Sequence, residues 1–307
     1  MGVQFAMYAI KNRKHPISLN DKIFFSAFYT LFTVILLLCA YPFYYLMIAT
    51  ISDNHLVEIG QVTLYPMGFH LENYRKVLQI ENLFNSAKIS VLRTLIGTAS
   101  GVLCTTYLAY FFTKENMWAR KFWYRLIVVT MYFSAGLIPG YLNNRMLGLL
   151  NTFWIYIVPS LISVYNMILV KTSIEAMPSE LEESAYLDGA GYIRRLVSIV
   201  MPLQKPIIAT IALFVAVGHW NDFFTTKLNI TDPDLYTLQF QLYELLQQVI
   251  SASSQIDNLV GEAQQASISP TGIRMTLTAV VVIPIILVYP FIQKYYVKGI
   301  MIGAVKG

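Results

Sequence analysis

A short charged segment interrupts an otherwise apolar sequence and carries the clearest chemistry in the chain. It reads Glu183-Ser-Ala-Tyr-Leu-Asp-Gly189-Ala-Gly, and Ile199-Val-Met-Pro202 follows it. The carboxylates of Glu183 and Asp188 can attract Arg or Lys side chains of a partner. The small residues between them leave room for close approach of another helix. The segment therefore has the composition of a docking surface, and the plainer alternative is a solvated loop between two helices.

The same segment predicts two short helices separated by glycine. Ser179 is expected to cap the first helix, with Glu182 completing a capping box three residues later. Gly189 and Gly191 are expected to end it, because glycine adopts the left-handed backbone conformation at little cost.

The first of these helices is expected to be amphipathic, with an apolar face against the protein. Leu181, Ala185 and Leu187 would be buried, and Glu180, Glu182 and Glu183 would be more exposed. A second amphipathic helix is expected from about Tyr192, and the prolines at 202 and 206 should break the chain after it.

Motifs of the common enzyme classes are missing from the sequence. No Gly-Lys dipeptide occurs, so there is no phosphate-binding P-loop, and there is no H-E-x-x-H or nucleophile elbow. The four histidines are scattered, and Cys39 and Cys104 lie in apolar runs without metal-ligand spacing. We therefore expect no catalytic residue, no metal site and no disulfide framework in this chain.

Composition predicts an all-α polytopic membrane protein. Hydrophobic residues make up 56% of the 307 residues and charged residues 13%, whereas soluble domains carry roughly 25% charged residues. Six spans of about 20 apolar residues are expected. They are Ile23–Ile51, Ser86–Phe112, Phe122–Leu142, Leu147–Val170, Pro206–Phe224 and Thr276–Tyr296.

The distribution of Lys and Arg predicts the orientation of these spans. With a cytoplasmic N-terminus, 15 of the 22 basic residues fall on the cytoplasmic side, as the positive-inside rule requires. Both termini are therefore expected in the cytoplasm, and no nucleic-acid partner is needed to explain the net charge of +5.

Two long connections are then expected on the outer side, Ser52–Asn85 and Thr225–Met275. Connections of this length are often functional, and a solvated amphipathic hairpin is the alternative.

Three motifs resemble one family. The segment from Glu183 to Pro202 resembles the EAA loop of ABC-importer permeases, with Ser184 and Met201 in place of the usual Ala and Leu. His219-Trp-Asn-Asp-Phe223 looks like the W-N-D/E-F signature of carbohydrate-uptake permeases. The ending Lys298–Gly307 looks like the tail of the maltose-transporter small permease and its oligosaccharide and polysaccharide-fragment relatives.

This resemblance implies the type I ABC importer permease fold in a bacterial cytoplasmic (inner) membrane. Residues 1–22 would form a cytoplasmic arm, 23–296 the permease domain with its EAA loop at 175–205, and 297–307 a cytoplasmic tail with an extended path at Gly303. The expected partners are a homologous second permease, two ATPase subunits, a solute-binding protein outside the cell, and membrane lipid. ATP and Mg would be held by the ATPases. The residues expected at the ATPase-docking surface are Glu183, Ser184, Ala185, Asp188, Gly189, Ala190 and Pro202.

An ionisable residue inside a span is a functional-site candidate, so Asp222 and its neighbours place a candidate solute path late in the fifth predicted span. The Trp220 indole could stack on a sugar ring, and Asn221 and Asp222 could bond its hydroxyls. The alternative is that this segment anchors the helix at the outer interface, where Trp is common. Asn166 is a further candidate, and the intramembrane Arg93 is expected to pair with an acid or to extend toward the interface.

Two other transport functions remain open at this point. One is an importer for a peptide or an amino acid, against which the Trp-Asn-Asp-Phe segment and the C-terminal tail argue. The other is an ion-coupled transporter, which would need several intramembrane acids where the sequence offers Asp222. A membrane-embedded enzyme is a rival from another class, and it would need a catalytic cluster.

Overall fold

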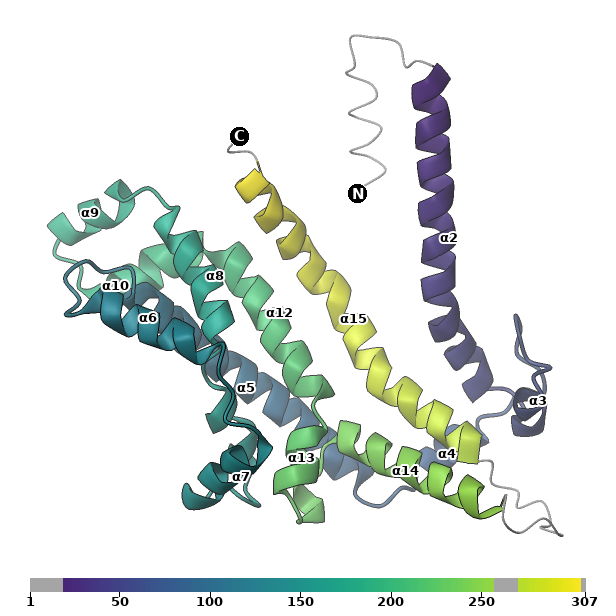
Figure 1. The fold of residues 1–307 in the computed structure, drawn as a ribbon. Coiled ribbons are helices and arrows are strands. Elements are labelled where there is room, and N and C mark those ends of the chain that lie inside the picture. The colour runs from purple at the N-terminus through teal and green to yellow at the C-terminus, as the bar shows by residue number, and fades with distance from the viewer. Residues whose placement is uncertain (1–18, 257–269, 305–307) are drawn as a thin grey trace. The chain divides into compact units, whose positions relative to one another are not determined.

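The computed structural model describes residues 19–256 and 270–304, and all of the regular structure in these ranges is helical (Figure 1). The chain divides into two compact units, residues 1–70 and 71–307, which are described separately. Most of the predicted N-terminal arm lies outside the described residues.

The first unit is built on one long helix. Helix α2 (Leu19–Thr50) has 32 residues and is therefore about 48 Å long at 1.5 Å per residue, enough to cross a hydrocarbon core of roughly 30 Å. Within this unit its apolar side chains are exposed along most of its length. Helix α3 (Asn54–Glu58) follows, and the Asp53 carboxylate caps it by accepting hydrogen bonds from the backbone N–H of His55 and Leu56.

The second unit is organised around helix α5, which packs against α8 and α12, while α12 packs in turn against α15. Gly97 and Gly101 lie on the buried face of α5 toward α12. The elements of this unit are α4 (Glu72–Leu78), α5 (Leu83–Phe111), α6 (Arg120–Thr130), α7 (Leu137–Met146), the 3-10 turns η1 (Phe153–Tyr156) and η2 (Val158–Ser160), α8 (Val164–Glu175), α9 (Glu180–Leu187), α10 (Tyr192–Arg195), the π-helical turn η3 (Leu196–Val200), α11 (Met201–Leu203), α12 (Lys205–Asn221), α13 (Phe224–Asn229), the 3-10 turn η4 (Pro233–Leu235), α14 (Leu238–Ile256) and α15 (Pro270–Ala304).

Fewer unbroken spans appear than the six predicted. In the described residues, α2 and α5 are each long and apolar enough to cross a membrane, and the number rises to four if each of two bent helix pairs is one span. The bends are 48° before α8 and 86° before α12. Helix α15 includes a shorter apolar helix segment, Thr271–Leu287. The six-span topology stays a prediction.

The third and fourth predicted spans are the ones that the structure breaks. The third is divided into α6 and α7, because the chain leaves the helix after Thr130 and turns at Gly136, which has a φ of +87°. The fourth begins as short 3-10 turns around Pro159, and α8 starts only at Val164. The Ser163 side chain caps α8 by accepting a hydrogen bond from the Asn166 N–H.

Two other regions are more regular than the sequence predicts. Much of the second outer connection is the amphipathic helix α14, whose Leu238 and Leu242 pack with Val77, Leu83 and Leu277. At the C-terminus, α15 stays helical through Ala304, so Gly303 lies in a helix and not in an extended tail.

Helix α5 connects two opposite ends of the unit (Figure 1). Near its start, the Ser90 hydroxyl accepts a hydrogen bond of 2.8 Å from the Leu238 N–H of α14. Near its end, the Tyr110 hydroxyl donates to the Glu182 carboxylate of α9 at 2.7 Å. The second predicted outer connection and the predicted cytoplasmic loop therefore lie at opposite ends of one helix.

Candidate functional site

The predicted helix–glycine–helix segment forms as α9, a tight turn and α10. Gly189 has a φ of +79°. Its N–H bonds the Tyr186 carbonyl, and the Ala190 N–H bonds the Ala185 carbonyl at 2.9 Å. This paired hydrogen-bond pattern is the Schellman motif, which favours glycine at the left-handed position. Gly191 has an ordinary φ of −67°, so only the first of the two glycines is needed for its backbone conformation.

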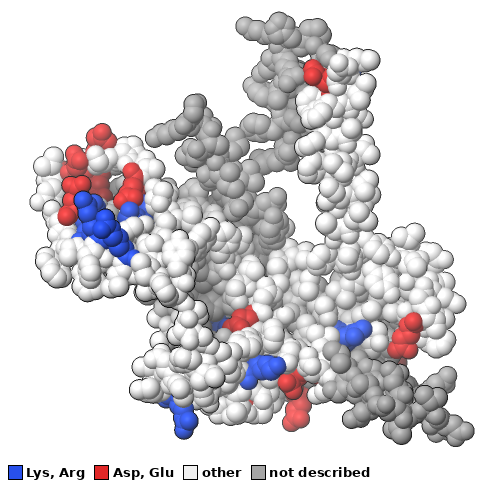
Figure 2. Space-filling view, in the orientation of Figure 1, with Lys and Arg blue, Asp and Glu red and all other residues white. Residues whose placement is uncertain are grey.

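The exposed face of this loop mixes carboxylates with apolar side chains. Glu183, Ser184 and Asp188 are exposed, as is Pro202, and Ala185 is buried in the direction of the protein. Leu187 was expected on the buried face, but 85% of it is exposed. Tyr186 and Ile193 are exposed as well, and exposed apolar side chains grouped beside charged ones are typical of a contact surface. Figure 2 shows acidic and basic residues gathered at the end of the unit that α9 and α10 form.

Two expectations about the start of α9 are wrong. Ser179 occupies the capping position, but its side chain accepts no capping hydrogen bond. Glu182 is not an exposed residue completing a capping box, because its side chain is only 15% exposed and points into a cluster of donors. The Glu182 carboxylate pairs with cations of other segments and does not bond the backbone at the start of α9.

The donors around Glu182 come from two segments, the end of α5 with the residues that follow it, and α10. Oε1 of Glu182 accepts from the Tyr110 hydroxyl of α5, from the Lys114 ammonium just beyond α5, and from Nη1 of Arg195 in α10 at 3.2 Å. The Arg195 guanidinium also lies 4.5 Å from the centre of the Tyr192 ring. We call Tyr110, Lys114, Glu182 and Arg195 the Glu182 cluster.

The Glu182 cluster favours the ionised carboxylate. Burial raises the pKa of Glu182, but the hydrogen bonds from Lys114 and Tyr110 and the nearby cations outweigh it and hold the pKa below its ordinary value. Because the folded-state pKa is lowered, the cluster's stabilisation is present above the ordinary glutamate pKa. It is lost as the pH falls through the folded-state value.

A second set of hydrogen bonds closes the base of the loop. Nε2 of Gln204 donates to the Ser173 carbonyl at 3.0 Å, and the Ser173 hydroxyl donates back to Oε1 of Gln204 at 2.5 Å. Gln204 is buried at the 86° bend between Pro202 and Pro206. Helix α8 and the start of α12, which enter and leave the loop, are thereby held together.

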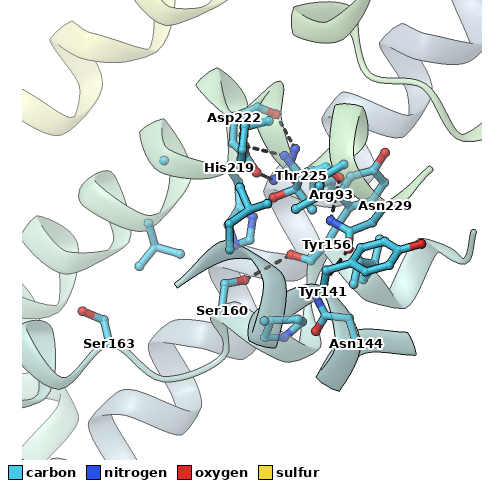
Figure 3. Close-up of a pocket in the computed structure, with 18 of the residues that line it drawn as sticks. Arg93, Tyr141, Asn144, Tyr156, Ser160, Ser163, His219, Asp222, Thr225 and Asn229 are labelled. Atoms are coloured by element: carbon cyan, nitrogen blue, oxygen red, sulfur yellow. Dashed lines mark hydrogen bonds and ion pairs between the residues drawn. The ribbon is translucent and has the colours of Figure 1, made fainter. Parts of the chain in front are cut away.

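A cavity of about 520 Å³ lies further along the unit, between α5, α7, α8, α12 and α13. Figure 3 shows that its lining mixes aromatic rings with hydroxyl and amide groups. Its polar and ionisable lining residues are Arg93, Tyr141, Asn144, Tyr156, Ser160, Ser163, Asn166, His219, Asp222, Thr225 and Asn229.

Arg93, the only Lys or Arg among the described residues that line this cavity, is already paired. The Arg93 guanidinium donates to the Asp222 carboxylate and, at 2.7 Å, to the Asp222 carbonyl. It also lies 4.4 Å from the centre of the Tyr156 ring. The expectation that Arg93 pairs with an acid is confirmed, and Asp222 serves as its counterion.

His219 packs against α5 at Gly97, which has no side chain. A Cβ atom at Gly97 would come within 2.4 Å of Nε2 of the buried His219. The close approach of α5 and α12 beside the cavity therefore depends on glycine at this position.

The four residues predicted for the solute path divide into two pairs. Asn166 and Asp222 line the cavity. The Trp220 indole instead donates to the Val281 carbonyl of α15 at 3.0 Å, and its ring packs in a core cluster. The exposed Asn221 donates back to the Val217 carbonyl of its own helix. The structure therefore does not bring all four together.

Several residues of both sites were missed from the sequence. Lys114 and Glu182 lie in two predicted cytoplasmic connections of a chain poor in charge, so opposite charge on one side was the available signal. Gln204, a polar residue between two prolines, offered another. Nothing in the sequence marked Tyr156, which is one of many tyrosines. Among the described residues, no group of three or more His, Cys, Asp or Glu could hold a metal ion.

Comparison with known proteins gives relatives over nearly the whole chain. The polygalacturonan/rhamnogalacturonan transport system permease protein YtcP of Bacillus subtilis (strain 168) is 35% identical over 290 residues, which are 94% of this chain and 100% of that protein. The galactooligosaccharides transport system permease protein GanQ of the same organism is 28% identical, covering 91% of this chain and 94% of its own.

A solved structure and a family model agree with these relatives. A chain of a bacterial ABC transporter involved in the import of the acidic polysaccharide alginate superimposes with a TM-score of 0.82 at 28% identity, covering 92% of this chain and 100% of that chain. The predicted helical permease fold is thus confirmed. The model of the binding-protein-dependent transport system inner membrane components matches residues 101–302, and this chain belongs to that family of transport permeases.

Proposed function

We propose that this chain forms half of the translocation pore of an ATP-driven importer for an oligosaccharide. A homologous second permease would complete the pore, two ATPase subunits would bind at the 175–205 loop, and a solute-binding protein would deliver the sugar from outside the cell. Both termini and this loop would lie in the cytoplasm of a bacterial cell. ATP and Mg would be held by the ATPases.

The exposed tip of the 175–205 loop is the observation that carries this proposal. The side-chain carboxylates of Glu183 and Asp188 make no hydrogen bond or ion pair within the described residues, and Leu187 beside them is exposed. Carboxylates that steer a basic partner, next to an apolar side chain that it can bury, are the components of a protein interface. The tight turn at Gly189 and the Glu182 cluster would hold this surface in a fixed shape.

The lining of the cavity supports a carbohydrate as the solute. Hydroxyl and amide groups there can bond sugar hydroxyls, and the rings of Tyr141 and Phe214 offer flat apolar faces. The names of the relatives point to polysaccharide fragments and oligosaccharides. We therefore propose oligosaccharides as cargo, with fragments of acidic polysaccharides as the first to test.

Copurification tests the proposed assembly. The tagged chain, produced from its native operon, should bring down a second permease and an ATPase. In proteoliposomes with the solute-binding protein, oligogalacturonides, alginate oligosaccharides or maltodextrins should stimulate ATP hydrolysis. Glu183→Lys should reduce the amount of bound ATPase, since it places like charge against a basic partner. An intact complex without ATPase, or one stimulated by peptides and not by sugars, would contradict the proposal.

Cysteine labelling tests the proposed orientation. In a Cys39→Ala, Cys104→Ala background, Lys121→Cys should resist an impermeant thiol reagent in intact cells, and Glu81→Cys should react. Both positions are exposed in the structure. Labelling at position 121 from outside would overturn the orientation.

A further inference from the structure

Two neighbouring glutamates on α9 have opposite environments. Glu182 is largely buried and accepts hydrogen bonds from three residues on two segments, whereas the exposed Glu183 carboxylate has no hydrogen-bond or ion-pair partner within the described residues. A docking surface needs an exposed residue such as Glu183. A buried and hydrogen-bonded residue such as Glu182 instead fixes the position of the loop relative to the rest of the permease.

The contacts of Glu182 lead directly to α5. Tyr110, which is 3% exposed, lies in the last turn of α5, and Lys114 follows that helix and lies 3.9 Å over the Tyr110 ring. Arg195 brings in α10, so α9 is tied to both of its neighbours through one carboxylate oxygen. A displacement of α9 therefore either breaks this cluster or moves the end of α5.

Helix α5 is continuous from this cluster to the cavity. Arg93 lies on the same helix as Tyr110, roughly 25 Å away at 1.5 Å per residue, and lines the cavity through its pair with Asp222. In the interval between them, Gly97 and Gly101 pack α5 against α12. One helix thus carries a loop contact at one end and a cavity contact further along.

We propose that Glu182 is a positioning residue that transmits movement of the ATPase-docking loop through Tyr110 and Lys114 to α5, and along α5 to the Arg93–Asp222 pair in the cavity. This inference rests on the proposed binding of ATPase at the loop. It assigns the two glutamates different tasks. Glu183 contacts the partner, and Glu182 couples the partner to the pore.

The experiment measures nucleotide-dependent exposure of the cavity, for which the transported sugar need not be known. Gly140→Cys is a suitable reporter, because Gly140 lines the cavity and a Cβ there meets no atom within 4 Å. In the complete complex, with Cys39 and Cys104 replaced by Ala, its rate of modification by a small thiol reagent is measured with and without Mg·ATP. The parental rate should change severalfold on addition of nucleotide.

The test compares Glu182→Gln with the matched variant Glu183→Gln. Glu182→Gln should keep bound ATPase at the parental ratio and lose most of the nucleotide-dependent change at position 140. Glu183→Gln should reduce bound ATPase. Lys114→Met, which lies outside the loop, should reproduce the loss seen for Glu182→Gln. The double variant Glu182→Gln/Lys114→Met should be no worse than either single variant.

The outcomes separate this inference from the proposed function. A parental complex that contains no ATPase contradicts the proposed function. A parental complex with ATPase but no nucleotide response at position 140 overturns the inference alone. So does a full response in Glu182→Gln, or ATPase loss in Glu182→Gln equal to that in Glu183→Gln. If Glu182→Gln does not assemble, Lys114→Met decides, and a full response in that variant overturns the inference.

Discussion

The two charged clusters of the second unit are built in opposite ways. In the Glu182 cluster a carboxylate is the centre, and one oxygen accepts from a phenol, an ammonium and a guanidinium. In the cavity a guanidinium is the centre, and Arg93 donates twice to Asp222 while it stacks on Tyr156. Both clusters contact α5, one beside its cytoplasmic end as proposed and one within the predicted span.

This difference indicates how much stability each cluster loses when one of its side chains is removed. The Glu182 carboxylate has three donors at the edge of the unit, so the loss of one donor costs little stability because two others still hold the ionised carboxylate, even where the link to α5 is weakened. The Arg93 side chain is 3% exposed and has one acidic partner among the described residues. A buried charge that loses its only counterion is costly, so we expect the cavity pair to dominate stability and the Glu182 cluster to dominate coupling.

Removal of the Arg93 charge should give the largest effect on stability. Arg93→Met leaves Asp222 without its cation. Because the Asp222 side chain is 29% exposed, the free energy of unfolding should fall by an amount at or below the low end of the about 3–5 kcal/mol expected for a fully buried pair, and assembly of the complex should be reduced. Lys114→Met, matched in type of change, should cost clearly less. Thermal unfolding of the purified complex measures both.

A double variant sharpens this test. Arg93→Met/Asp222→Leu removes both charges and should recover much of the stability lost in Arg93→Met, because replacing a buried pair by apolar residues is often neutral. If the double variant is less stable than the single one, Asp222 has a role beyond that of counterion.

The contact between α5 and α12 should give the next largest effect. Gly97→Ala forces the buried His219 ring to move, since the new Cβ would lie 2.4 Å from Nε2, and overpacking of this kind costs about 1–3 kcal/mol. Gly101→Ala is the control, because the nearest atom there, a Val215 methyl group, is 3.5 Å away. Equal melting temperatures for the two variants would show that α12 adjusts freely.

The loop could be predicted because its information is local. Turn chemistry fixes the Gly189 conformation within a few residues, and the spacing from Glu183 to Pro202 identifies the family. The burial of Glu182 and the exposure of Leu187 could not be predicted from the helix alone. They depend on Lys114 and Arg195, which reach α9 from other segments.

The cavity could be predicted from the sequence less well than the loop. Apolar composition located the spans approximately, but a break at Gly136 and short turns around Pro159 satisfy an apolar pattern as well as an unbroken helix does. The predicted path residues were chosen for their chemistry. Which side of α12 Trp220 and Asn221 occupy depends on the packing of α5 and α15, and that packing placed Trp220 against α15.

At the loop, a smaller effect on stability should accompany a clear effect on docking. Gly189→Val places a β-branched residue at a φ of +79°, which costs about 1–2 kcal/mol, and we expect less ATPase to copurify. Gly191→Ala, at a φ of −67°, should bind ATPase as the parent does. If Gly189→Val binds normally, the Schellman turn is not needed for docking.

The smallest effects are expected for the polar residues around the cavity, and they separate the two pairs of predicted path residues. The Asn166 side-chain amide lines the cavity and makes no hydrogen bond within the described residues, so it is available to a solute. Asn166→Ala should slow sugar uptake by about 2- to 10-fold, the equivalent of one hydrogen bond of roughly 0.5–1.5 kcal/mol. Asn221→Ala removes an exposed amide that bonds its own helix, and uptake should change by less than about 2-fold, since such surface substitutions stay within about 0.5 kcal/mol. Initial rates in proteoliposomes, normalised to assembled complex, measure both, and a larger loss for Asn221→Ala would move the solute path from the cavity to the exposed face of α12.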